Sequence, residues 1–270
     1  MAGDLRPLLI HLPAWLLVLF RLTGIFIFAP VLGSNEVPRQ VKVFLAVGLS
    51  LCVYPTLLEP GRPAAPMVGA ILDNQMSIWM LGAAVGVELL IGLAIGYAAS
   101  LPLIGMQIGG QVIDQQVGLG LAGIFNPDLG EQSGMVGQFL FIVALALFIV
   151  LGGHRIMFAV LIGSFDRVPL GGFTEFESLV YLMVGLLQVS FDLALRIAAP
   201  LLCLTFLQTV AMGFVARTVP QINILSIGFP MRTLMGALLL MMFIGIAAQV
   251  YTNGVYDIFR ELLRFWTVQP

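Results

Sequence analysis

Apolar stretches long enough to cross a lipid bilayer recur along almost the whole chain. A helix needs about 20 apolar residues to span the hydrocarbon core, and here such stretches alternate with short turns rich in glycine, proline and charge. The composition agrees, since 60% of the residues are hydrophobic and 10% are charged. These features exclude an ordinary soluble domain and predict an all-α polytopic membrane protein.

The pattern predicts about six apolar helical segments. They cover residues 8–30, 41–58, 76–101, 135–151, 179–215 and 234–251. Pro102 is expected to stop the third segment, after which residues 103–117 resume as a more polar helix. Residues 155–165 extend the fourth segment after a glycine break. The fifth contains Pro200 and is predicted to be one kinked helix or two, and the last is followed by a short amphipathic tail.

The basic residues favour cytoplasmic termini. With six crossings, more of them lie on the side of the two termini than on the other side. The larger set is Arg6, Arg62, Arg155, Arg167, Arg260 and Arg264, and the smaller set is Arg39, Lys42, Arg217 and Arg232.

Charged residues inside the apolar segments need a reason, because a charge at mid-bilayer costs about 2.5–3.5 kcal/mol. Asp192 and Arg196 are four residues apart, so they share a helix face. We interpret them as an internal ion bridge that lets the helix insert, with a functional site as the alternative. Arg21 and Glu88 have no local partner. Pairing with each other, contact with a partner subunit and reach toward an interface all stay open for these two residues.

A stripe of polar residues lies on one face of the helical pattern before residue 118. At 100° per residue, Gln107, Gln111, Asp114 and Gln115 fall within roughly a third of a turn. Such a stripe is costly against lipid, so it faces protein or water. Hydrogen bonding between helices and the wall of an aqueous path are both compatible with it.

Glycines and a proline follow this polar stripe. Gly118, Gly120 and Gly123, with Pro127, predict a loop over residues 118–134. A movable closure and an ordinary exposed loop both fit this composition.

Elsewhere, glycines four residues apart predict close approach between helices, within this chain or with another. These pairs are Gly82 with Gly86, Gly92 with Gly96, and Gly105 with Gly109.

The sequence carries no motif of an enzyme or nucleotide-driven motor. Walker A, His-Glu-x-x-His, Gly-x-Ser-x-Gly and Cys-x-x-Cys patterns are all missing from it. His11 and His154 have no neighbouring ligand, and Cys52 and Cys203 are interpreted as buried small apolar residues. The net charge of −2 argues against nucleic acid. We therefore expect no catalysis, no metal and no cofactor.

Three stretches together resemble one known family. They are residues 28–38, the stretch 118–128, and the stretch 220–230, which is the most specific. In the last stretch the characteristic positions are Pro220, Asn223, Gly228, Phe229 and Pro230. Their order and spacing over nearly the whole chain resemble the family of the flagellar biosynthesis protein FliR and its type III secretion counterpart.

The resemblance implies a single-copy subunit of a bacterial export gate. In that family the subunit assembles with several copies of FliP and FliQ into a helical complex of kinked hairpins that forms a protein-conducting channel. Much of the complex stands above the membrane plane. The resemblance implies a FliP-like part over residues 1–172 and a FliQ-like part over residues 173–270. It also implies FlhB and FlhA as neighbours, unfolded exported proteins as cargo, and a place in the inner membrane at the flagellar basal body.

The family also implies a channel plug in the loop after the polar stripe. The matching positions are Gly118, Leu119, Gly120, Leu121, Ala122, Gly123, Ile124, Phe125, Asn126 and Pro127. On this resemblance the polar stripe faces the channel or a neighbouring subunit. Two alternatives stay open: an injectisome gate subunit of the same family, and a self-contained secondary transporter. In a transporter, Glu88, Asp114 or Asp192 would be the coupling carboxylate.

Overall fold

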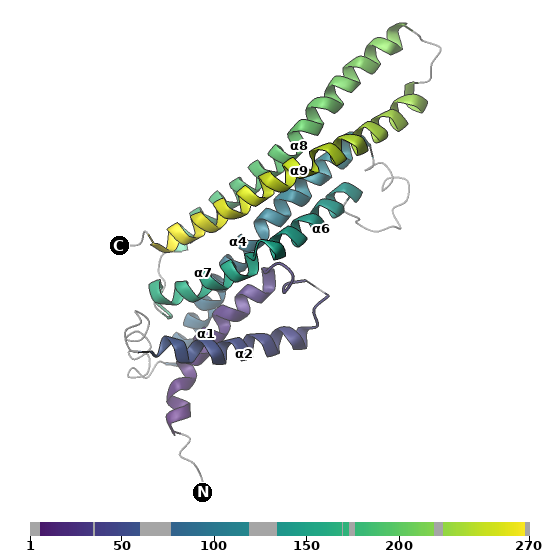
Figure 1. The fold of residues 1–270 in the computed structure, drawn as a ribbon. Helices are drawn as coiled ribbons and strands as arrows, with labels where there is room; N and C mark the ends of the chain where they lie inside the picture. The colour runs from purple at the N-terminus through teal and green to yellow at the C-terminus, as the bar shows by residue number, and fades with distance from the viewer. Residues whose placement is uncertain are drawn as a thin grey trace. The chain divides into compact units, whose positions relative to one another are not determined.

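The computed structural model describes residues 6–34, 36–59, 77–118, 134–168, 170–172, 176–218 and 224–267, which contain helices and no strand (Figure 1). The helices are α1 (Arg6–Phe28), α2 (Arg39–Leu57), α4 (Ile78–Val117), α6 (Met135–Val150), α7 (Gly153–Arg167), α8 (Phe176–Thr218) and α9 (Ile224–Thr267). Five of these are long and apolar enough to cross a membrane, or six spans if α6 and α7 count as one. The prediction of an all-α polytopic membrane protein is confirmed.

The chain packs into two compact units. Unit 1 comprises residues 1–100, 152–186 and 257–270, and unit 2 comprises residues 101–151 and 187–256. This division follows internal contacts. It does not address whether residues 1–172 are FliP-like and residues 173–270 FliQ-like, so that division stays a prediction.

In unit 1, α1 and α4 approach so closely that backbone touches backbone. A β-carbon on Gly24 would lie 2.8 Å from the backbone nitrogen of Leu93, and one on Gly96 would lie 2.7 Å from the carbonyl oxygen of Ile25. Gly92 lies against the backbone of Arg21 in the same way. The contacts advance in the same direction along both helices, so α1 and α4 are parallel. The predicted pair Gly92 and Gly96 therefore serves packing within this chain.

The turn after α1 is held by hydrogen bonds to its own backbone. Gly33 N–H donates to the carbonyl of Ala29 at 2.7 Å, and the Lys42 ammonium donates to the carbonyl of Gly33 at 3.1 Å. Val31 has a φ of 70°, a left-handed conformation that is unusual for a β-branched residue. This turn lies within the stretch 28–38, one of the three that carry the family resemblance.

In unit 2, α4 packs against α8 through its third glycine pair. A β-carbon on Gly105 would lie 2.7 Å from the carbonyl oxygen of Ser190, and one on Gly109 would lie 3.0 Å from that of Ala194. The Ser190 hydroxyl donates to the carbonyl of Leu101 at 2.8 Å. These contacts bring α8 directly beside the position of Pro102.

The prediction that Pro102 ends a helix was wrong, because α4 continues through it to Val117. A proline inside a helix costs about 3 kcal/mol, and neighbouring helices and serine side chains offset that cost in membrane proteins. The apolar span of α4 is 67% buried, the largest share among the described spans. Packing on both sides therefore keeps this helix continuous.

The long helices α8 and α9 pack as antiparallel neighbours in unit 2. Arg232 donates a hydrogen bond to the Thr209 hydroxyl at 2.8 Å, and a β-carbon on Gly254 would lie 3.0 Å from Leu193.

The structure decides the open question about Pro200, since α8 is one helix. It also corrects the last segment, because α9 begins at Ile224 and includes the predicted tail.

Glycines mark two helix ends where the sequence predicted them. Gly152 has a φ of 70° and separates α6 from α7. Gly118 has a φ of 89°, and its N–H donates to the carbonyl of Asp114 at 3.0 Å, which closes the end of α4. Residues 119–133 of the predicted loop lie outside the described residues.

Candidate functional site

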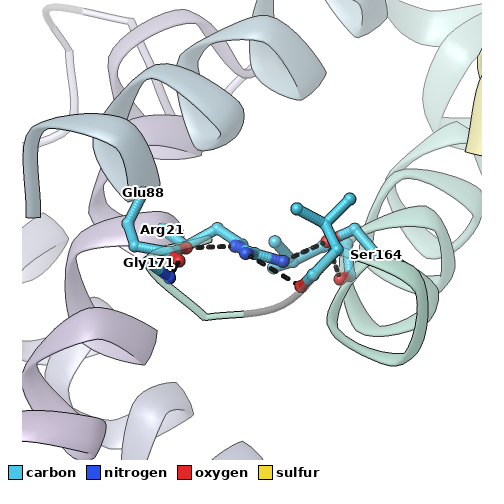
Figure 2. Close-up of polar contacts among 6 residues, drawn as sticks. Arg21, Glu88, Ser164 and Gly171 are labelled. Atoms are coloured by element: carbon cyan, nitrogen blue, oxygen red, sulfur yellow. Dashed lines mark hydrogen bonds and ion pairs between the residues drawn. The ribbon is translucent and has the colours of Figure 1, made fainter. Parts of the chain in front are cut away.

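Arg21 of α1 and Glu88 of α4 form a fully buried ion pair in unit 1. The guanidinium Nε donates to Glu88 Oε2 at 2.5 Å, and both side chains have 0% exposure. Figure 2 shows the two side chains pointing toward one another, with Ser164 beyond the guanidinium. Of the three possibilities left open by the sequence, mutual pairing is the one observed.

The rest of the pair's polar surface is satisfied by α7 and the turn after it. Arg21 donates to the Ser164 hydroxyl at 3.1 Å and to the carbonyl of Val168 at 3.5 Å. The Gly171 N–H donates to Glu88 Oε1 at 2.8 Å (Figure 2). The guanidinium carbon also lies 4.4 Å from the centre of the Phe165 ring, a cation–π contact. Two charges thus join α1, α4, α7 and the chain leading to α8.

Asp114 caps the first turn of α6 from a different helix. Its two carboxylate oxygens accept the backbone N–H groups of Val136 at 3.1 Å and Gly137 at 2.9 Å. These are the N2 and N3 donors of α6, and the adjacent N-cap residue Gly134 has no side chain to bind them. A carboxylate here also interacts favourably with the helix dipole. Asp114 is 2% exposed, so its charge is sheltered by this chain itself.

Glycines make room for the Asp114 cap. A β-carbon on Gly134 would overlap the Asp114 carboxylate, and one on Gly110 would lie 2.6 Å from the Cα of Gly137. Sequence reasoning singled out Asp114 but missed these glycines as its binding surface. Gly134 and Gly137 stand at the start of an apolar run, and this position is the signal that could have identified them as an uncapped helix start.

The other residues of the polar stripe differ in exposure. Gln107 and Gln111 are half-buried, and Gly137 packs beside both of them. Gln115 is exposed. Hydrogen bonding between helices, one of the two interpretations of the stripe, is what the structure shows for Asp114. A channel-side position for the glutamines stays a prediction.

Two of the stretches that carry the family resemblance meet in unit 2. A β-carbon on Gly118, at the end of α4, would lie 3.0 Å from the ring of Phe229 in α9. Seven residues further along α9, a β-carbon on Gly236 would lie 2.5 Å from the side chain of Val117. The predicted start of the plug loop therefore lies against the stretch 220–230, more than 100 residues away in sequence.

Asp192 and Arg196 form the predicted ion bridge along α8. The Arg196 Nε lies 2.7 Å from Asp192 Oδ2. The side chain of Asp192 is 55% exposed and that of Arg196 is 68% exposed. The pair therefore forms as the i,i+4 spacing predicted. In contrast to Arg21 and Glu88, it lies on the surface of the chain.

Several predicted positions lie outside the described residues. These are residues 119–127 of the plug together with Pro220 and Asn223. Gly228 is half-buried, and Pro230 is exposed inside α9.

The interpretation of the cysteines as buried was wrong, because Cys52 and Cys203 are both exposed, and neither forms a disulfide. Within the described ranges, no three His, Cys, Asp or Glu side chains are placed to hold a metal ion.

The chain is similar in sequence to proteins of bacterial export systems. The profile of a family described as bacterial export proteins, family 1, matches residues 12–258. The flagellar biosynthetic protein FliR of Bacillus subtilis is 29% identical over 93% of each chain. FliR of Escherichia coli is 26% identical over 90% of this chain and 89% of its own. FliR of Aquifex aeolicus is 26% identical over 91% of this chain and 90% of its own.

Proposed function

We propose a function from one premise: the chain belongs to family 1 of the bacterial export proteins. On this premise it is the export-gate subunit of a flagellar type III secretion apparatus in the inner membrane. It forms part of the protein-conducting channel with FliP and FliQ. The observation that carries the proposal is the match, over about nine-tenths of both chains, to relatives named as flagellar biosynthetic proteins.

Helix length supports an assembly that extends beyond the bilayer. At 1.5 Å per residue, the 43 residues of α8 measure about 64 Å and the 44 residues of α9 about 66 Å. The hydrocarbon core is about 30 Å thick. Helices of this length would need a tilt of about 60° to lie inside it, whereas membrane helices tilt by about 0–40°. Parts of both helices would therefore lie outside the hydrocarbon core.

The exposed apolar side chains of these helices support the presence of partner subunits. Phe206 and Phe214 of α8 are 71% and 70% exposed, and Met241 and Met242 of α9 are each 75% exposed. Where the helices leave the hydrocarbon, such side chains need cover from other proteins. FliP and FliQ would supply this cover, with FlhB and FlhA nearby.

The channel side lies, on this proposal, along the end of α4. Gln115 is exposed on the polar stripe, and Gly118 marks the start of the proposed plug, residues 118–127. The plug occludes the closed channel, and its glycines allow it to withdraw when an unfolded protein passes. Gln107 and Gln111 belong to the same wall.

Genetic complementation and purification test the proposed function. In a flagellated host that lacks its own copy, the tagged chain is expected to restore swimming. After gentle detergent extraction it is expected to co-purify, as one copy, with FliP and FliQ. A monodisperse chain that transports a solute alone in liposomes would instead identify a secondary transporter. Restored secretion by an injectisome without restored swimming would assign it to that system.

Leakage through the membrane tests the plug separately. Deletion of residues 120–125 is expected to increase the passage of small ions or dye through an assembled gate. The matched control is deletion of six residues from the segment between α2 and α4, residues 64–69. If the plug deletion leaves leakage unchanged while the gate still assembles, these residues do not occlude the channel.

A further inference from the structure

The exposed ion pair on α8 is part of a longer polar ridge. Gln188, Asp192 and Arg196 are spaced four residues apart, and all three are exposed in unit 2. We call these three residues the α8 ridge. They lie near the middle of a helix that is apolar enough to span a membrane, with a mean hydropathy of 1.8.

Large apolar side chains flank the α8 ridge. Phe191 is 50% exposed and Leu195 is 60% exposed, and each lies directly beside one of the charged residues. Lipid would leave the ion pair in hydrocarbon, where charged groups are costly. Water would leave Phe191 and Leu195 exposed to solvent. Neither lipid nor water therefore suits this face. A protein surface with both polar and apolar groups can bind the ion pair and also cover Phe191 and Leu195.

The charges of the ridge disfavour a second copy of the same chain as its occupant. Copies of a membrane protein insert in one orientation, so a symmetric dimer through this face would bring two parallel α8 helices together. A two-fold axis parallel to these two helices brings residues at the same level along them together. Asp192 would then face Asp192 and Arg196 would face Arg196, which like-charge repulsion penalises.

We propose that the α8 ridge docks a helix of a different subunit of the export complex. That helix carries an acidic side chain opposite Arg196 and a basic or amide side chain opposite Asp192, about 6 Å apart along its axis. The Arg196 guanidinium has five N–H donors, and the bond to Asp192 uses Nε, so donors are available to a second carboxylate. The inference rests on the proposed function, because it takes the occupant from the same assembly.

Exchanging the two charges tests the docking directly. The double variant Asp192→Arg/Arg196→Asp keeps an ion pair within α8 but reverses the polarity of the ridge. If the pair serves only to let the helix insert, this variant should behave as the unmodified chain does. If the ridge docks a complementary helix, the variant is expected to reach the membrane at the normal level. The amount of partner subunits that co-purifies with it is expected to fall by a factor of about ten or more.

A matched variant and a cross-link complete the test. The exchange Asp257→Arg/Arg260→Asp reverses a second exposed pair, which lies on α9, and is expected to leave assembly unchanged. A photo-cross-linker at Ala199, one turn beyond Arg196, is expected to label another protein subunit. Normal assembly of the α8 exchange, or labelling of lipid or of a second copy alone, would overturn the docking proposal. If the unmodified chain itself recovers no flagellar export protein, the proposed function fails instead.

Discussion

The ion pair between Arg21 and Glu88 depends on both partners being present. Each charge is fully buried, and each is satisfied by the other and by a few groups from α7 and the turn after it. Desolvation offsets much of the attraction in such a pair, so its net contribution to stability is small or unfavourable. Its presence instead constrains which four chain segments can meet at this point.

Removal of one partner is expected to be far more harmful than removal of both. Arg21→Met or Glu88→Leu leaves a buried unpaired charge, which should reduce the free energy of unfolding by about 3–5 kcal/mol. The double variant Arg21→Met/Glu88→Leu is expected to recover most of that loss. Thermal unfolding in detergent, with intact partner subunits bound, would measure the difference.

The exposed pair of Asp257 and Arg260 is the control for this experiment. Its side chains are 61% and 64% exposed, and the charged atoms lie 3.7 Å apart. Asp257→Asn is expected to change stability by less than about 1 kcal/mol. A double variant at the buried site that is no more stable than the single variants would show that the pair contributes more than charge compensation.

Asp114 acts at the scale of a helical element, because its carboxylate binds the first turn of α6. Asp114→Ala removes two charge-assisted hydrogen bonds and leaves two donors unpaired, so we expect a loss of about 2–3 kcal/mol. Asp114→Asn retains a capping oxygen and is expected to cost less. Hydrogen exchange at Val136 and Gly137 should accelerate in the alanine variant, whereas Gln115→Ala, on the exposed part of the stripe, should leave it unchanged.

The predicted glycine pairs fall into two groups, those that contact another helix and those that do not. A β-carbon on Gly92 would overlap the carbonyl oxygen of Arg21, whereas one on Gly82 or Gly86 meets nothing within 4 Å. The same sequence pattern therefore describes a packed contact in one place and an open face in another. Spacing alone cannot separate these cases, because it does not say which helix lies opposite.

Alanine at these glycines is expected to have opposite effects. Gly92→Ala should lower the thermal unfolding temperature, since the backbones of α1 and α4 would have to separate. Gly86→Ala, on the same helix, should be neutral or stabilising by up to about 1 kcal/mol from helix propensity. Equal unfolding temperatures for the two variants would contradict the close contact between α1 and α4.

At the scale of the whole molecule, the described helices leave many large apolar side chains exposed. Cys203 of α8 is exposed, and it lies two turns beyond Arg196 on the side of the α8 ridge. A thiol at this position reports whether that face becomes covered when the chain assembles.

Thiol labelling is expected to be fast in the isolated chain and slow in the complex. A Cys52→Ser variant keeps Cys203 as its one thiol. In detergent, assembly with partner subunits should reduce its labelling to the rate of a buried thiol. The converse variant, Cys203→Ser, reports on α2 in the same samples. Equal labelling of Cys203 with and without partners would show that this face of α8 stays uncovered.

The sequence by itself determined the helical class, most helix ends and which residues needed shelter from lipid. These properties depend on short-range patterns, such as the apolar run before Pro30, the glycine at position 118, and the spacing of Asp192 and Arg196. The tertiary structure decided the rest. It paired Arg21 with Glu88, 67 residues away, placed Asp114 on the start of α6, and carried α4 through Pro102. Long-range partners depend on which backbones approach closely, and that choice is made by packing over the whole unit.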